Sequence, residues 1–178
     1  MKNPSIKRVF RRIKTRLSFY PQLIRNSNSG ERQLVWRGRL RGKKVIVKDS
    51  RNIEEHYAEK QRRRELIKHL KEAQGNSYEL KVSKRYPAPN ENRLELYYNL
   101  PTRSEVLQLY IHKIHPKVRS VMKKSGLAGI ELYEKCEAAD HEMRQRLRTL
   151  DLEIDTYAGN ILVDVNSKGK IIFTLIDF

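Results

Sequence analysis

Three polar residues near the C-terminal end of the sequence stand among apolar neighbours: Asp155, Asn160 and Asp177. Asn160 is followed at once by an apolar run at residues 161–163, and Asp177 follows a second β-rich run at residues 171–176. Turn-forming residues separate the two runs, so the pattern predicts a β-hairpin. Strands this apolar are usually buried, and we expect the polar groups at their ends to converge at one rim.

Two carboxylates and an amide at one rim suit Mg²⁺, which prefers oxygen ligands and keeps substrate phosphates in its coordination shell. The alternative is purely structural: an Asx-capped turn and a hairpin that carry acidic residues without binding a ligand. This segment alone leaves both interpretations open, and the rest of the sequence has to decide between them.

The elements that must position these residues begin with a predicted pair of antiparallel strands. Turn residues at 26–30 precede a strand at residues 33–40, Gly42 forms a turn, and residues 45–48 form the second strand. Lys48 lies at the end of this second strand. A lysine in that position is usually solvated, unless a ligand requires it.

Helix and strand signals alternate through the middle of the chain. Apolar spacing predicts a helix over residues 53–71, and strands over residues 78–86 and 93–98 are joined by a turn rich in Pro and Asn. Thr102 or Ser104 caps the next helix.

The stretch that follows, residues 115–150, is predicted to be mostly helical, with an interruption at residues 126–129. The five histidines and the single cysteine have no metal-ligand spacing, so a zinc site is not expected.

Length and composition fit one domain or two small lobes. The chain has 178 residues, of which 33% are charged and 38% hydrophobic, and apolar runs recur throughout, so the chain is not expected to be disordered. No run approaches the roughly 18 apolar residues of a membrane span, and no secretory signal is visible. Cys136 is the single cysteine, which excludes a disulfide within the chain and fits a reducing compartment.

Positive charge is concentrated in the first part of the sequence. Residues 1–71 contain 22 lysines and arginines against 6 acidic residues, a surplus of 16 out of the total charge of +17. Such a surplus favours an anionic partner: a membrane surface, nucleic acid or a phosphorylated substrate.

Residues 4–18 have the spacing of a basic amphipathic helix, of the type that lies on anionic lipid headgroups, and Pro21 is expected to end it. Two alternatives stay open for this segment. It also resembles a mitochondrial transit peptide in composition, or it packs on the protein's own core with a solvated basic face.

The C-terminal pattern as a whole resembles a known family. The order Asp155, Asn160, hairpin and Asp177-Phe178 resembles the catalytic-loop and metal-binding segments of protein kinases and kinase-like phosphotransferases. The resemblance implies that Asp155 is the catalytic base, Asn160 a metal ligand and Asp177 the principal Mg²⁺ ligand, with ATP as the phosphate donor.

The resemblance extends to the earlier strands, where V-W-R-G-x-x-R-G-x-x-V-x-V-K is similar to the first three strands of a protein kinase. It implies that Lys48 binds nucleotide phosphates and that Val35 packs on the base. Of the three positions of the family's glycine-rich loop, only the middle one is retained, at Gly30.

The resemblance also assigns roles in the helix and in the segment after the strands. A helix glutamate should hold the phosphate-binding lysine; Glu65 is our first choice and Glu59 the second. Residues 94–101, L-E-L-Y-Y-N-L-P, resemble the passage between kinase lobes, so the backbone of Tyr98 to Leu100 is expected to hydrogen-bond adenine.

The sequence also departs from the family's pattern. Glu153 and Ile154 replace the His-Arg pair before the catalytic Asp, and Tyr157 replaces a lysine that would stabilise the transferring phosphoryl group. The sequence around Asn160, T-Y-A-G-N-I-L-V-D, resembles atypical bacterial kinases more than eukaryotic ones. Two such groups are small effector kinases and the sugar kinases of lipopolysaccharide-core biosynthesis. The sequence stops at Phe178, which implies a shortened large lobe.

We therefore expect an α+β, protein-kinase-like fold with two lobes. It consists of a basic N-terminal helix (residues 1–25), an antiparallel-sheet lobe (26–100) and a minimal helical lobe (101–178).

The expected function is ATP- and Mg²⁺-dependent phosphate transfer to a hydroxyl of a membrane-associated glycolipid, sugar or protein, in the cytoplasm or on the inner face of its membrane. The alternative is a non-catalytic module that binds an anionic membrane or nucleic acid. Nucleic acid ranks below the other partners because no known nucleic-acid-binding signature is present.

Overall fold

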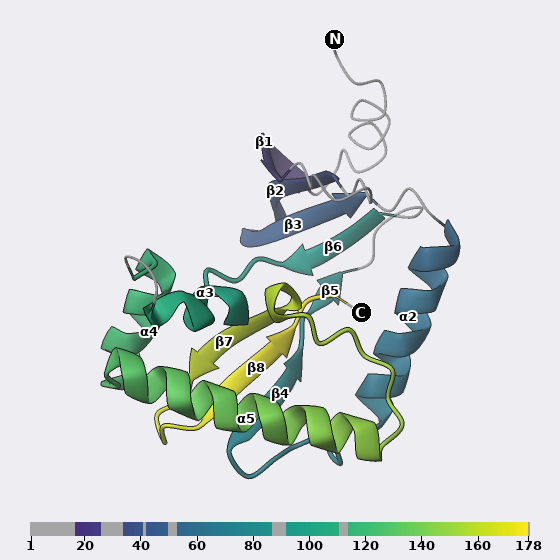
Figure 1. Cartoon of the computed structure of the whole chain (residues 1–178). Coiled ribbons are helices and arrows are strands. Elements are labelled where there is room, and N and C mark those ends of the chain that lie inside the picture. Colours follow the sequence, from purple (N-terminus) through teal and green to yellow (C-terminus); the bar gives the residue numbers. More distant parts are fainter. Residues whose placement is uncertain are drawn as a thin grey trace. The chain divides into compact units, whose positions relative to one another are not determined.

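The computed structural model describes residues 17–25, 34–40, 42–49, 53–86, 92–110 and 114–177 (Figure 1). The described residues form a mixed α/β structure, as expected from the sequence, with strands in two sheets and four α-helices. They fall into two compact units. One contains the residues up to Tyr57 together with Lys84–Tyr98, and the other contains Ala58–Ser83 and the residues from Asn99 onward. The domain boundaries at 25/26 and 100/101 stay a prediction.

The first unit is built on a five-stranded antiparallel sheet with the strand order β1-β2-β3-β6-β5. Its strands are β1 (Leu17–Arg25), β2 (Leu34–Leu40), β3 (Lys43–Asp49), β5 (Arg85–Tyr86) and β6 (Asn92–Leu96). The hairpin predicted around Gly42 is confirmed: this glycine has φ +79, and β2 and β3 pair on either side of it. Val45 and Val47 are fully buried in this unit.

Strand β1 corrects the prediction for the N-terminal segment. The helix predicted over residues 4–18 overlaps β1 at Leu17 and Ser18, which are extended and pair with β2, so the prediction is wrong for these two residues. Residues 1–16 lie outside the described residues. Pro21 lies where the β1–β2 register shifts between Phe19 and Leu23, on an edge strand. A proline, which has no N–H to donate, is tolerated there.

The second unit combines a three-stranded sheet with helices, in the strand order β4-β8-β7. The strands are β4 (Tyr78–Val82), β7 (Ile161–Val165) and β8 (Ile171–Leu175). The helices are α2 (Ile53–Lys68, whose first residues belong to the first unit), α3 (Arg103–Leu107), α4 (Pro116–Ser125) and α5 (Gly129–Thr149), with short 3-10 helices at Gln108–Tyr110 and Ala158–Asn160.

The strand predicted over residues 78–86 is divided in the structure. β4 pairs in parallel with β8, whereas β5 pairs antiparallel with β6 in the other sheet. The division lies between Ser83, whose amide donates to the carbonyl of Leu175 (2.8 Å), and Lys84, whose carbonyl accepts from the amide of Leu96 (2.9 Å). Local alternation predicts a strand but does not specify its partner, which explains the error.

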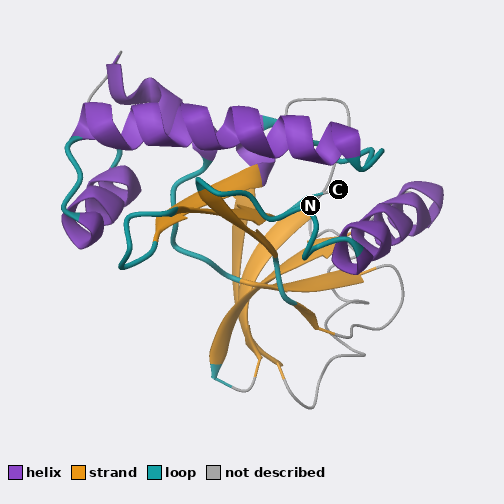
Figure 2. Ribbon diagram, turned by 90° about the horizontal axis from the view of Figure 1, so that it is seen from below, coloured by secondary structure: helices purple, strands orange, loops and turns teal. Residues whose placement is uncertain are grey.

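The core of the second unit lies between α5 and the three-stranded sheet (Figure 2). Helix α5 contributes a buried apolar stripe whose members are three or four residues apart: Leu132, Cys136, Ala139, Met143 and Leu147. β8 is buried along its whole length between β4 and β7. Burial raises the pKa of the Cys136 thiol to about 12, so this cysteine is a packing residue and not a nucleophile.

The helix ends follow local capping chemistry. Thr102, one of the two predicted caps, forms a capping box with Glu105, and Gly126 ends α4 with φ +73. Among the described residues, no helix combines the length and apolar character needed to cross a membrane.

Glu142 of α5 holds the loop between α2 and β4. Its carboxylate accepts hydrogen bonds from the hydroxyl of Ser77 and from the amides of Asn76 (2.7 Å) and Ser77 (3.0 Å). These bonds, led by the one from the hydroxyl, hold the pKa of Glu142 below its usual value. The loop is thereby tied to the same helix that carries the core.

Gly75 allows this loop to approach its neighbours closely. A Cβ at this position would lie 2.1 Å from Cε1 of Tyr78 and 2.6 Å from Oε1 of Glu142. Tyr78 cannot move aside easily, because it is fully buried and its hydroxyl donates to the carbonyl of Ala73 (2.6 Å).

We therefore expect Gly75→Ala to lower the free energy of unfolding by about 1–3 kcal/mol, the usual cost of overpacking a tight site. Chemical denaturation measures this change. The matched control is Gly129→Ala at the start of α5, where the nearest atom to the new Cβ is 3.6 Å away, so little change is expected. Equal effects of the two variants would contradict the packing described.

Candidate active site

The loop between α5 and β7 brings two of the predicted site residues together. Oδ1 of Asp155 accepts a hydrogen bond from the amide of Tyr157 (2.8 Å), and Oδ2 accepts one from Nδ2 of Asn160 (2.7 Å). The first bond closes an Asx turn, which is the structural alternative raised by the sequence. The second links the predicted base to the predicted metal ligand. Asp155 is exposed, so its carboxylate is accessible from solvent.

The hairpin brings the third residue to the same end of the sheet. β7 and β8 pair antiparallel from Ile161 opposite Leu175, and the amide of Ile176 donates to the carbonyl of Asn160 (3.0 Å). Asp177 is the next residue along the chain. The rim predicted at the open end of this hairpin therefore contains Asn160 and Asp177, with Asp155 bound to Asn160.

The side chains at this rim offer amide and carboxylate oxygens, the donor types that Mg²⁺ prefers. Because a carboxylate oxygen accepts hydrogen bonds, Asn160 turns its Nδ2 towards Asp155 and presents Oδ1 on the other side of the amide. The described residues contain no group of three or more His, Cys, Asp or Glu side chains that could hold a metal ion. A metal here would thus depend on the amide, on one or two carboxylates and on phosphate oxygens, which is a normal arrangement for Mg²⁺.

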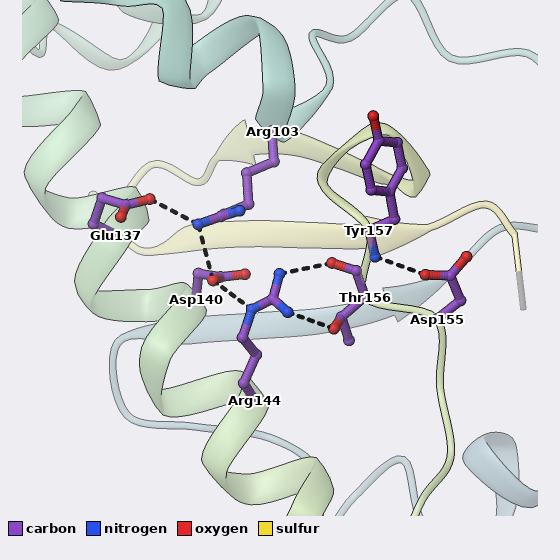
Figure 3. A network of polar contacts seen from close by, with 7 residues as sticks. All are labelled: Arg103, Glu137, Asp140, Arg144, Asp155, Thr156 and Tyr157. Carbon is purple, nitrogen blue, oxygen red and sulfur yellow. Dashed lines mark hydrogen bonds and ion pairs between the residues drawn. The ribbon is translucent and has the colours of Figure 1, made fainter.

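Arg144 of α5 holds the candidate loop from the side of the helix (Figure 3). Its NH1 donates to the hydroxyl of Thr156, and its NH2 donates to the carbonyl of Thr156, both at 2.7 Å. Its Nε donates to Oδ2 of Asp140 (2.7 Å), one helical turn earlier. Since Thr156 directly follows Asp155, this guanidinium sets the position of the backbone next to the predicted base.

Asp140 is shared with a second arginine. NH2 of Arg103 lies 3.0 Å from Oδ2 of Asp140 and 2.8 Å from Oε1 of Glu137. Asp140 is 4% exposed and Arg103 is 9% exposed, so these charges are largely removed from water. We call Arg103, Glu137, Asp140 and Arg144 the arginine–carboxylate cluster. It joins α3, α5 and the loop, and its two positive and two negative charges balance.

The residues before Asp155 are held differently. Leu152 and Ile154 pack, partly buried, against the hydrophobic core, while Glu153 is exposed. Apolar packing therefore holds one side of the loop, and Arg144 holds the other.

The predicted residues of the first sheet lie in the other unit. Val35 and Lys48 are direct partners across β2 and β3, but their side chains are outside the described part of the structure. Gly30 lies outside the described residues altogether. Their assigned roles stay predictions.

The remaining predicted residues lie on α2 and after β6. Glu65 binds Nζ of Lys68 on the exposed face of α2 (2.7 Å), an ion pair that lowers the pKa of Glu65. Glu59, on the same helix, is only 2% exposed. Tyr98 and Leu100 are half-buried in the segment after β6, and Leu100 packs against the core of the second unit.

Sequence reasoning missed the arginine–carboxylate cluster. One signal was available: Asp140 interrupts the apolar stripe of α5 and precedes Arg144 by four residues, which is the spacing of a helical ion pair. Arg103 and Thr156 gave no such signal, because their contacts join segments far apart in the sequence.

Comparisons with known proteins give limited information. No protein-family model matches the sequence, and no curated protein matches it. Among 28 matching chains of solved structures is a mutant form of the PknI kinase domain of Mycobacterium tuberculosis, with 14% sequence identity and a TM-score of 0.36. The match covers 89% of this chain and 60% of that kinase domain. It is a weak likeness in fold.

The pairing of Asp155 with Asn160 predicts the effect of an added charge. Asn160→Asp would place a second carboxylate against Oδ2 of Asp155, where two negative charges repel. We expect this variant to have a lower melting temperature at pH 7 than Asn160→Ala, which only removes the hydrogen bond. Thermal unfolding followed by circular dichroism measures the difference, and identical melting curves at pH 7 would contradict the pairing.

Proposed function

We propose that the protein is an ATP- and Mg²⁺-dependent phosphotransferase of the atypical bacterial type. The observation that carries the proposal is the grouping of Asp155, Asn160 and Asp177 at the open end of the β7–β8 hairpin. A structural Asx turn explains the bond from Asp155 to Tyr157, but it does not require the amide of Asn160 or an acid after β8. Both are explained by metal and phosphate chemistry.

Asp155 takes the role of the base that orients the acceptor hydroxyl. Its carboxylate already accepts two hydrogen bonds, and a carboxylate has about four acceptor positions, so a hydroxyl can still bind. The bonds to Tyr157 and Asn160 limit the rotation of the side chain. Catalysis of phosphoryl transfer depends mainly on such positioning and on charge stabilisation.

Asn160 and Asp177 take the role of metal ligands, and Lys48 that of the phosphate-binding cation. Magnesium, when bound with ATP, would neutralise negative charge on the transferring group. Tyr157 occupies the position at which kinases carry a lysine, so the loop itself supplies no cation there. In this proposal more of the charge stabilisation would come from Lys48 and from the magnesium ion that Asn160 and Asp177 would hold.

The acceptor in this proposal is a hydroxyl group of a sugar, glycolipid or protein. The surplus of 16 positive charges in residues 1–71 favours an acceptor that is anionic or held at an anionic membrane surface.

Nucleotide binding and phosphate transfer test the proposal separately. We expect ATP to raise the melting temperature only with Mg²⁺ present, and γ-phosphate to be transferred to an acceptor or to the protein itself. Lys48→Ala and Asp177→Ala should abolish both effects, whereas Asp155→Ala should abolish transfer and keep the thermal shift. Glu153→Gln, at an exposed acid beside the loop, is the control and should behave like the wild type. No thermal shift and no transfer in the wild type would end the proposal.

We propose Glu59, the second choice from the sequence, as the glutamate that supports the phosphate-binding lysine. Glu65 is engaged by Lys68 on the surface, whereas Glu59 is almost fully buried, and a buried carboxylate persists only with a compensating partner. We therefore expect Glu59→Gln to weaken ATP binding about 10- to 100-fold, the usual effect of losing a supporting residue. Glu65→Gln should leave it nearly unchanged. Isothermal titration measures both affinities, and the reverse order would assign the role to Glu65.

The charge distribution also favours a second candidate, a non-catalytic module that binds an anionic surface through residues 1–71. This function predicts salt-sensitive binding to anionic vesicles, or to DNA, without any effect of nucleotide. Vesicle flotation at low and high salt, with and without Mg²⁺-ATP, separates the two candidates.

A further inference from the structure

We infer that Arg144 is the positioning residue that sets the geometry of Asp155 in this protein. The inference rests on the proposed function for its kinetic consequences. The contacts that carry it lie within the second unit and are independent of that function (Figure 3).

The geometry of the contacts is specific. Two nitrogen atoms of one planar guanidinium bind two different oxygens of Thr156, its side-chain hydroxyl and its carbonyl, both at 2.7 Å. Such a fork restrains the direction as well as the distance of its partner, which a single ammonium cannot do. The carbonyl of Thr156 belongs to the peptide unit whose amide is that of Tyr157, and this amide donates to Oδ1 of Asp155. The restraint on Thr156 is thereby passed to the carboxylate.

The guanidinium is itself held before any ligand arrives. The carboxylate of Asp140 accepts a hydrogen bond from Nε of Arg144. Arg103 of α3 holds Asp140 in turn through an ion pair, and it also forms an ion pair with Glu137. A buried carboxylate left without its partners is strongly destabilising, so the cluster has a strong preference for one arrangement. Because α5 also carries the core stripe, Arg144 is anchored to the helix that packs most extensively in the second unit.

The residues before Asp155 do not fix the direction of its carboxylate. Ile154 packs on the core through an apolar side chain and Glu153 is exposed, so the direction of the Asp155 carboxylate is left to the residues after it. Those residues are Thr156, Tyr157 and Asn160, and Arg144 binds the first of them.

Arg144 therefore acts through the loop and does not touch the reacting groups. Losing it should displace Asp155 while leaving Asn160 and Asp177 held by the hairpin register. We expect Arg144→Ala to lower kcat about 10- to 100-fold, as displaced catalytic groups usually do, with the KM for ATP changed by less than about twofold. Arg144→Lys should recover only part of the loss, because lysine cannot form the fork.

Variants of Thr156 test the same contact from its other side. Thr156→Val removes the hydroxyl that accepts the hydrogen bond from NH1 of Arg144. Thr156→Ser keeps this hydroxyl, so the serine variant should resemble the wild type. The double variant Arg144→Ala/Thr156→Val should be no worse than Arg144→Ala alone, since the bond is already lost. Arg148→Ala, at an exposed position on the same helix, is the control and should have no effect.

A measurement that does not depend on enzyme activity keeps the test independent of the proposed function. Hydrogen exchange followed by NMR on the whole chain reports the amides of Tyr157 and Asn160, which donate to Asp155 and to the carbonyl of Tyr157 (2.8 Å). Arg144→Ala and Thr156→Val should accelerate exchange at both amides by at least about tenfold, and Thr156→Val, which leaves the pairing of Arg144 with Asp140 intact, should leave the amides of α5 unchanged. Unchanged exchange at both amides would overturn the inference.

The two failures are distinguishable. If the wild type transfers no phosphate but the loop amides respond as described, the proposed function fails and the positioning role stands. If the wild type is active and Arg144→Ala retains full kcat, the positioning role fails and the proposed function stands.

Discussion

The buried carboxylate of Asp140, shared by the guanidinium groups of Arg103 and Arg144, is the interaction on which the candidate site depends. A charge that is 4% exposed is costly unless it is paired, so two cations from different segments are drawn to it. One of them belongs to α3, and the other continues to the loop at Thr156. A single buried charge thus connects a capped short helix, the longest helix of the second unit and the residue next to the predicted base.

Much of the hairpin and of its rim could be predicted from the sequence, because the signals are local. The apolar runs of β7 and β8 differ from their surroundings, and Asn166 and Gly169 form the turn between them. Once the strands pair, the ends that carry Asn160 and Asp177 meet because the register allows no other arrangement. The predicted cap at Thr102 and the turn at Gly42 were correct for the same reason.

The errors and omissions concern interactions between distant segments. The helix predicted over residues 4–18 does not extend to Leu17 and Ser18, because β1 gains its hydrogen bonds from β2, and apolar periodicity cannot predict such a partner. The sequence predicted β4 and β5 as one continuous strand. In the structure β4 pairs with β8, which lies about 90 residues later in the chain. The arginine–carboxylate cluster was missed because its contacts from α3 and from the loop cross to α5, and only the Asp140–Arg144 spacing is local.

The charges of the cluster decide how it influences the site. Its two guanidinium groups face two carboxylates, so the net charge beside the loop is close to zero. The residues between Asp155 and Asn160 are all uncharged. An arginine neutralised in this way adds little positive potential at the rim, and its effect on Asp155 is one of geometry. Any cation that stabilises a phosphoryl group at this rim must therefore come from outside the cluster, and in the proposed function it is the metal ion.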